Sequence, residues 1–422
     1  MPSLHVAARM EHARALQPDV WSTFRRVHLP PDCINLGQGY MNFAPPAWAC
    51  EGAEAALKTA EGNQAAPVTG IQRLREAIKA FYGTQYGKEL DAETEIVVTG
   101  GIHAVLTAFV DPGDEVVIFE PFFDHHISSA VLNGGKPVYV PLHPSQDNQS
   151  QHGRKTWSID FGELRWHVAS RAITSRTKMI ILNTPHNPVG KVLTRQELET
   201  IAELAREYNL LVFSDEVYET IVYDDREHIR IASLPGMWER TLTVSSTSKL
   251  FAATGWRVGW LIGPPELVRP AFAATLRMSY CTNTPMQEAA ALSFERAAAH
   301  DFFAVQLQEY AEKRALLTGA FERVGIAYTV PEGGYFVLVD VSRVRWPDDY
   351  PFPVALKGRG RDFRAAWFIA VEVGVSSIPL TAFYCEEHQE FGENYLRVAF
   401  CKDVDTVKRA AERLQNLKNY IL

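Results

Sequence analysis

Short runs of apolar, β-branched and aromatic residues alternate with longer amphipathic stretches through the middle of the chain. Near-continuous hydrophobicity over four or five residues is typical of strands that are covered on both faces and pair mostly in parallel. This rhythm of strands and helices predicts an α/β domain. The predicted strands span residues 95–99, 115–119, 137–140, 178–182, 210–213, 241–244 and 260–262.

One of the intervening stretches carries a clear helix start signal. Thr194 and Glu197 form a T-x-x-E capping box, and apolar residues then recur at helical spacing from Leu198 to Ala205. We therefore expect a helix over residues 194–209, between two of the strands.

The pattern changes near residue 300, where a long helical stretch begins. It is followed by a predicted strand at 334–340, a helix near 363–373 and a strand at 395–400. These elements predict a second, smaller α+β domain. Two polar stretches, 143–155 and 344–361, interrupt the pattern, and we expect the first to be a surface excursion.

Composition narrows the class of protein. The 422 residues are 46% hydrophobic and 22% charged, which fits a globular chain of two or three domains. A net charge of −8 argues against nucleic acid as a partner, and no apolar run approaches the roughly 18 residues that suggest a membrane span. The five cysteines form no C-x-x-C pair and have no His-rich partner spacing, so we expect neither a disulfide framework nor a zinc or other metal site. A reducing compartment fits this pattern, with the cytoplasm favoured over the mitochondrion.

Lys249 is a candidate for covalent chemistry. It follows the predicted strand at 241–244 and Ser246, and it precedes a turn that contains Arg257. A desolvated amine beside an anion-binding group can form a Schiff base with a carbonyl, although a solvated surface lysine is the alternative. Ser246 to Lys249 is formally S-x-x-K, but the S-D-N and K-T-G motifs of the penicillin-binding enzymes are absent.

Two other polar groups follow predicted strands. Asn187 lies in an irregular N-T-P-H-N-P-V-G loop, where it is either a ligand-binding amide or part of an ordinary turn. Asp215 ends the strand at 210–213, with Tyr218 three residues later, and this carboxylate either faces a fixed cation or caps a helix.

Three further stretches could bind anions or rings. Gly100 and Gly101 join a strand to a helix whose free N–H groups could hold a phosphate, and the alternative is a plain turn. Arg397 lies in an apolar strand, either as a carboxylate clamp or facing solvent. His125 and His126 are adjacent, so their side chains diverge and a shared metal is not expected, and we expect Phe123 either to stack on a ligand or to pack in the core.

Together and in this order, these motifs resemble the fold-type I aminotransferases that use pyridoxal 5′-phosphate (PLP), and are most similar to the kynurenine/glutamine aminotransferase group. That group also acts as cysteine-conjugate β-lyases. The resemblance implies a three-layer α/β/α large domain at 49–300 and a small α+β domain formed by 1–48 and 301–422, in a homodimer. The stretches that carry it are NLGQG, DPGDEVVIFEPFFD, ILNTPHNPVGKV, SDEVYE, IASLPGMWERTLTVSS, ATGWRVGW, PEGGYFVLVD and YLRVAF.

The resemblance also implies roles. Lys249 would attach PLP and shuttle a proton, Asp215 would pair with the pyridinium nitrogen, and Arg397 would clamp the substrate carboxylate. The implied cofactor-binding residues are Gly101, Ile102, Phe123, Asn187, Asp215, Tyr218, Ser246, Lys249 and Arg257, and the implied substrate-binding residues are Gly37, Trp21, Asn187 and Arg397.

The implied reaction transfers an amino group from kynurenine, or from a related aromatic or large L-amino acid, to a 2-oxo acid. The alternative is β-elimination at a C–S bond. The chain departs from the family pattern at Ala65, where a tyrosine usually reaches a phosphate across the dimer, and at Thr282 and Asn283, where Phe and His are common. A Rossmann dehydrogenase is not supported, because Gly37-Gln38-Gly39 lacks the third glycine of the fingerprint.

Overall fold

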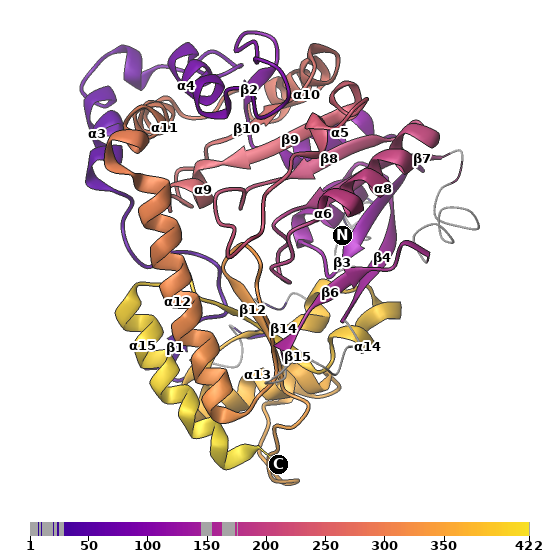
Figure 1. Cartoon of the computed structure of the whole chain (residues 1–422), viewed down its shortest axis with the longest axis vertical. Coiled ribbons are helices and arrows are strands. Elements are labelled where there is room, and N and C mark those ends of the chain that lie inside the picture. Colours follow the sequence, from indigo (N-terminus) through magenta and orange to yellow (C-terminus); the bar gives the residue numbers. More distant parts are fainter. Residues whose placement is uncertain are drawn as a thin grey trace, which may run out of the picture.

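A computed structural model of the chain describes residues 7, 10, 20, 23–24, 29–144, 154–162, 174 and 176–421. Its larger sheet has eight strands in the order β2-β10-β9-β8-β7-β3-β4-β6 (Figure 1). All seven predicted strands are present. The strands are β2 (Ile96–Val98), β3 (Glu115–Glu120), β4 (Lys136–Pro144), β6 (Trp157–Ile159), β7 (Thr177–Asn183), β8 (Leu211–Asp215), β9 (Thr241–Ser246) and β10 (Gly259–Ile262).

The centre of this sheet is parallel, as the hydrophobic runs predicted. Strands β4, β3, β7, β8 and β9 pair in parallel, whereas β10 is antiparallel to both of its neighbours. Asn183 of β7 pairs with Asp215 of β8, which in turn pairs with Val244 of β9. The register therefore brings the ends of three strands to one carboxyl edge.

Helices cover both faces of the sheet and complete the predicted three layers (Figure 1). Helices α5, α6 and α10 pack on one face, α8 packs on the other, and α4 and α11 cover β2 and β10. The capping box of Thr194 and Glu197 is formed at the start of α8, which confirms this helix. The helices of this part are α3 (Ala47–Ala56), α4 (Gln72–Tyr82), α5 (Ile102–Phe109), α6 (Asp124–Leu132), α8 (Arg195–Glu207), α9 (Thr247–Leu250), α10 (Pro265–Met278) and α11 (Thr284–Ala297).

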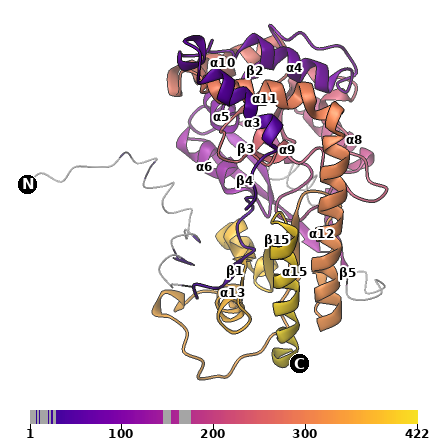
Figure 2. The ribbon, with the colours of Figure 1, turned by 90° about the vertical axis from the view of Figure 1, so that its left-hand side faces the viewer.

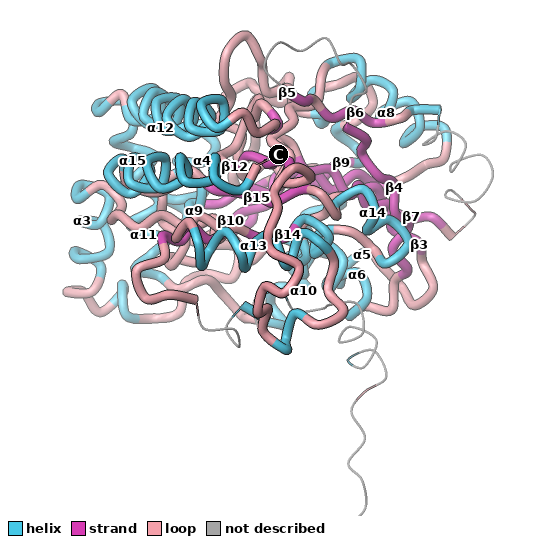
Figure 3. The backbone as a smooth tube through the Cα atoms, turned by 90° about the horizontal axis from the view of Figure 1, so that it is seen from below, coloured by secondary structure: helices cyan, strands magenta, loops and turns pink. Residues whose placement is uncertain are grey.

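The second sheet has five strands in the order β14-β15-β12-β11-β5. Helices α12 and α15 lie side by side against it (Figures 2 and 3). A short parallel pair of strands, β1 (Ile34–Asn35) and β13 (Val375–Ser376), joins the N-terminal segment to the C-terminal part of the chain. The other elements are β5 (Arg154–Lys155), β11 (Tyr328–Thr329), β12 (Phe336–Asp340), β14 (Ile378–Pro379), β15 (Tyr395–Ala399), α12 (Phe302–Val324), α13 (Arg361–Glu372), α14 (Gln389–Gly392) and α15 (Val404–Arg413).

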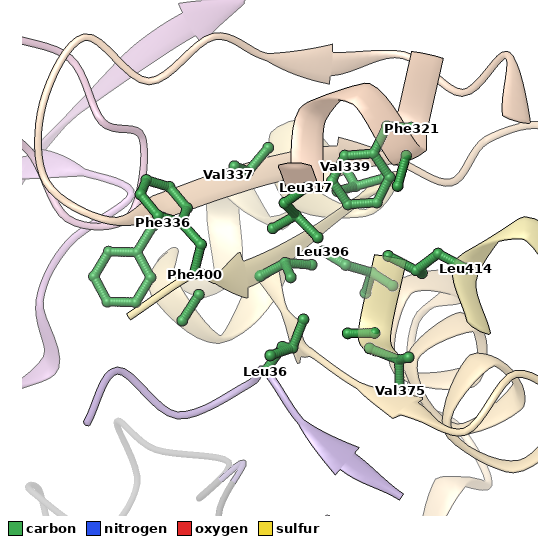
Figure 4. Close-up of a cluster of buried hydrophobic side chains, with 14 of the residues drawn as sticks. Leu36, Leu317, Phe321, Phe336, Val337, Val339, Val375, Leu396, Phe400 and Leu414 are labelled. Atoms are coloured by element: carbon green, nitrogen blue, oxygen red, sulfur yellow. The ribbon is translucent and has the colours of Figure 1, made fainter. Parts of the chain in front are cut away.

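A continuous apolar cluster holds the smaller sheet to its helices (Figure 4). Leu317 and Phe321 of α12 and Leu414 after α15 meet Leu396 of β15 in this cluster. Leu36, close to the N-terminal end of the described chain, packs among them and is fully buried. Because each of these large side chains loses its exposure to water, the cluster fixes β12 and β15 relative to the N-terminal segment.

The two ends of the stretch at 143–155, which we expected to be a surface excursion, belong to strands, and residues 145–153 lie outside the described residues. Strand β4 continues to Pro144, where it pairs with Trp157 of β6, and Arg154–Lys155 pairs in parallel with β11 of the smaller sheet. The polar composition of this stretch gave no strand signal. Strands pair through their backbone groups, so polar residues can also form them. Among the described residues, no helix has the length and apolar character required to cross a membrane.

Candidate active site

A cavity of about 550 Å³ lies between the carboxyl edge of the large sheet and the smaller sheet. Ligands of open α/β sheets bind at such edges. Most of the residues predicted to bind cofactor or substrate line this cavity: Ile102, Phe123, Asn187, Asp215, Tyr218, Ser246, Lys249, Arg257 and Arg397.

Lys249 enters the cavity from the short helix α9, directly after β9. Its Nζ donates to the carbonyl oxygen of Gly39 at 3.3 Å and lies 5.9 Å from the ring centre of Tyr218. Burial lowers the pKa of this ammonium to about 8, because the charged form loses its hydration. Lys249 is therefore closer to a neutral, nucleophilic amine than a surface lysine is.

We expect the lowered pKa of Lys249 to be measurable in the cofactor-free protein. The neutral amine is the reactive form, so the rate of labelling of Lys249 by an amine-reactive probe should rise with pH and reach half of its maximum around pH 8. Exposed lysines should reach half of their maximal rate near pH 10.4. Peptide mass spectrometry would measure both rates in one sample, and a shared midpoint near pH 10.4 would contradict the prediction.

Asp215 is held by a buried histidine. Its Oδ2 lies 3.0 Å from Nε2 of His126 in α6, and its Oδ1 accepts from the Val217 N–H at 3.4 Å. Asp215 and His126 are both almost fully buried. Burial and the nearby His126 lower the pKa of His186 to about 3, so this third group stays neutral. The contacts with His126 and the Val217 N–H therefore fix the orientation of the Asp215 carboxylate in the wall of the cavity.

Sequence reasoning missed both histidines. In the sequence, His126 is one of two adjacent histidines that are not expected to share a metal, and His186 is part of an irregular loop. The available signal was the position of His126 three residues after Phe123, which places the two on one side of a helical turn. The two rings lie 5.5 Å apart, edge to face, and Phe123 lines the cavity.

Arg397 faces the cavity from β15 without a carboxylate partner among the described residues. Its Nη1 donates to Oδ1 of Asn187 at 3.1 Å and its Nη2 to the carbonyl of Gly37 at 2.9 Å, while Nε has no partner. The guanidinium lies between the rings of Phe336 and Phe383, 4.4 and 4.7 Å from their centres. Burial lowers its pKa to about 10. A buried cation of this kind is suited to an anionic ligand.

Groups suited to an anion gather where α5 and β9 border the cavity. Gly101 caps the N-terminus of α5 with φ +75°, and a Cβ there would lie 2.6 Å from Val244. Ile102, Ser246 and the exposed Arg257 line the cavity beside it. The N-terminus of α5, a hydroxyl and a guanidinium together form a cradle for a phosphate. Trp21, the remaining predicted site residue, lies outside the described residues.

The loop at residues 37–40 connects these groups through its backbone. Gly39 accepts from Lys249 and from the Tyr335 hydroxyl at 2.9 Å, and Gly37 accepts from Arg397. The buried ammonium of Lys402 donates to the carbonyls of Gln38, at 3.1 Å, and of Tyr40. Lys402 therefore positions a loop whose carbonyls accept hydrogen bonds from both Lys249 and Arg397.

Replacing Lys402 by methionine should loosen this loop and weaken substrate binding. Loss of a charged donor to two backbone carbonyls costs about 1.5–3 kcal/mol, so KM for the amino donor should rise roughly tenfold or more, with a smaller change in kcat. Lys402→Arg should retain most of the effect because it keeps the donor. Steady-state kinetics on both variants would test this, and an unchanged KM in Lys402→Met would contradict it.

The model of the family "Aminotransferase class I and II" matches residues 31–414. The chain belongs to this family. BNA3 of Saccharomyces cerevisiae, named a probable kynurenine–oxoglutarate transaminase, is 43% identical over 396 residues, covering 92% of this chain and 88% of that protein. Kynurenine–oxoglutarate transaminase 1 of Homo sapiens is 36% identical over 416 residues, covering 94% and 95%. The crystal structure of yeast Bna3p matches this aminotransferase with a TM-score of 0.92 at 40% identity, covering 99% of this chain and 100% of that chain.

Aminotransferases of this family use PLP, and the residues of the cavity fit that cofactor. The site offers a buried amine of lowered pKa in Lys249, a buried carboxylate in Asp215 and a phosphate cradle at Gly101. Arg397 lies on another wall of the cavity, where it remains available to a carboxylate. The resemblance found in the sequence and the predicted α/β fold are both confirmed.

Proposed function

We propose that this aminotransferase transfers the amino group of kynurenine, or of a related aromatic or large L-amino acid, to a 2-oxo acid. The observation that carries the proposal is the buried, carboxylate-free guanidinium of Arg397 between two phenylalanine rings. Arg397 would bind the α-carboxylate, and Phe336 and Phe383 provide apolar walls beside it. The names of the yeast and human relatives support kynurenine as the donor.

Bound PLP supplies a ring that withdraws the electron pair left on the substrate Cα when its proton is removed. In our proposal Lys249 moves that proton with its Nζ, and Asp215, oriented by His126, holds a proton on the ring nitrogen. Asn187 and Tyr218 would orient the ring and Phe123 would stack on it. The phosphate would lie against Gly101, Ile102, Ser246 and Arg257.

A panel of amino donors and 2-oxo acids tests the proposed substrate class. Kynurenine with 2-oxoglutarate should yield glutamate, and donors with large side chains should be preferred to alanine. Product analysis with a cysteine S-conjugate separates the alternative, because β-elimination releases pyruvate and ammonia without an acceptor. If no aromatic or large donor reacts in the PLP-loaded enzyme, the proposal is wrong.

We also propose that the protein works as a homodimer in the cytoplasm. Large side chains are exposed at the C-terminal end of α10, with Met278 at 44% and Tyr280 at 55% of their full surface. His103 lines both the main cavity and the hollow that contains Met278, which places this apolar surface near the mouth of the site. The cysteines are unpaired, as a reducing compartment favours. Sedimentation analysis would measure the oligomeric state.

In such a dimer, Ala65→Tyr should tighten PLP binding. Ala65 is exposed in the single chain, and the preceding carbonyl of Gln64 accepts from Thr284 at 2.6 Å, which fixes this segment. A tyrosine hydroxyl that reaches the phosphate of the partner's site would add about 1 kcal/mol, or roughly a fivefold lower Kd. Titration of cofactor-free protein with PLP measures this change, with Ala65→Phe as the control that lacks the hydroxyl. Equal Kd values for Tyr and Phe would count against it.

A further inference from the structure

A cluster of three possible metal ligands lies outside the active-site cavity, at the junction of the two sheets. Glu120 ends β3 and its side chain is fully buried. Cys385 and His388 lie on the segment that follows β14. A carboxylate oxygen, a thiol sulfur and an imidazole nitrogen from these residues all lie within 4.8 Å of one another.

Local structure brings the three together. Cys385 caps a 3-10 helix that ends at His388, and side chains three residues apart in such a helix lie on the same side. The buried carboxylate of Glu120 accepts from the Cys385 backbone N–H and contacts Nδ1 of His388. The C-x-x-H spacing of Cys385 and His388 does not by itself predict a metal site, because the third ligand, Glu120, lies more than 260 residues away in the sequence.

We propose that Glu120, Cys385 and His388 form a binding site for Zn²⁺. Thiolate, imidazole and carboxylate are the ligands that Zn²⁺ takes, and three protein ligands with a water in the fourth position make a common tetrahedral set. The His388 side chain is 23% exposed, so an ion and its water can enter. Magnesium and calcium, which prefer oxygen ligands, do not match this set.

Charge balance fits a divalent ion. A carboxylate, a thiolate and a neutral imidazole together carry two negative charges, which Zn²⁺ neutralises. The thiol proton of Cys385 leaves to solvent when the metal binds, so the loaded site carries no net charge at this buried junction.

A second group of possible metal ligands shows that the residue types alone do not make a metal site. Glu216, Glu219 and His228 are equally close together. There, however, Arg230 forms ion pairs with both glutamates, so a fixed cation already occupies the position between them. Glu120 instead pairs with His388, which is itself one of the three proposed ligands.

The proposed site joins two walls of the active-site cavity. Glu120 lies three residues before Phe123, and Phe383 lies two residues before Cys385. The Phe122 N–H also donates to the Phe383 carbonyl at 2.8 Å. Bound Zn²⁺ therefore ties the segment of Phe123 to the segment that packs on Arg397.

Equilibrium dialysis of the PLP-loaded enzyme against Zn²⁺, with metal measured by elemental mass spectrometry, tests the site. We expect one tight equivalent in the parent and in Cys33→Ser, a control that removes another half-buried thiol. Cys385→Ser and His388→Gln should each weaken binding by at least about tenfold. Unchanged binding in either variant, or no binding by the parent, overturns the proposal.

Cobalt substitution and melting curves supply readouts that do not depend on activity. Co²⁺ in the parent should give the visible bands of tetrahedral coordination, and these bands should disappear in Cys385→Ser. Zn²⁺ should raise the melting temperature of the parent but not that of Cys385→Ser, because only the folded state holds the ligands together. Octahedral Co²⁺ spectra, or equal stabilisation of both proteins, would contradict the site. Melting curves without metal establish that each variant is folded.

Discussion

Lys249→Ala is expected to abolish transamination and to remove the visible absorbance of the PLP-loaded protein. Lys249 is the buried amine whose pKa lies near 8, and in our proposal it both attaches the cofactor and moves the Cα proton. General acid–base catalysis alone contributes about 10²- to 10⁴-fold, so the rate should fall by at least about 10²-fold, and by more because the attachment point of the cofactor is also lost. Steady-state assays and an absorbance spectrum measure the two effects.

A chemical trap separates loss of attachment from loss of folding. Borohydride reduction should fix the cofactor covalently on Lys249 in the parent, adding its mass to that peptide, and should leave Lys249→Ala unlabelled. Lys408→Ala is a matched control because Lys408 is exposed on α15 and does not line the cavity. A variant that keeps the visible band and is still labelled on reduction would exclude Lys249 as the attachment point.

The sequence predicts those helices and strands whose formation depends on residues close together in the chain. The capping box at Thr194 and Glu197 acts within one helical turn, and it marked the start of α8 correctly. The apolar run before Asp215 identified β8, and the parallel pairing of β7, β8 and β9 then placed Asn183 and Asp215 at one edge. Motif order and strand ends were therefore sufficient to identify the cavity.

The supporting contacts could not be predicted because they join residues far apart in the chain. His126 and Asp215 are 89 positions apart, and Lys402 and Tyr40 are 362 positions apart. No periodicity or spacing reports such pairs, since they arise only when helices and strands pack. The same reason applies to β5, where two polar residues complete the smaller sheet through backbone pairing with β11.

Arg397→Ala should cause the largest loss of substrate recognition. Nη1 and Nη2 of Arg397 are held by Asn187 and Gly37, so the guanidinium is already oriented before a ligand arrives. Each charge-assisted hydrogen bond contributes about 1.5–3 kcal/mol, and loss of a bidentate pair should reduce kcat/KM by roughly 10² to 10⁴-fold. Arg397→Lys should recover only part of this because an ammonium cannot bind a carboxylate through the same planar fork.

An amino donor without a carboxylate makes the test specific to binding of the substrate carboxylate by Arg397. The parent should strongly prefer an amino acid to the corresponding decarboxylated amine, and Arg397→Ala should lose most of that preference while keeping the visible absorbance of bound PLP. A purely structural role for Arg397 would instead lower both activities together. Arg397 is buried among Phe336, Phe383 and Asn187, so a melting curve must show that the variant is folded. If the folded variant keeps the parent's preference, the carboxylate is bound elsewhere.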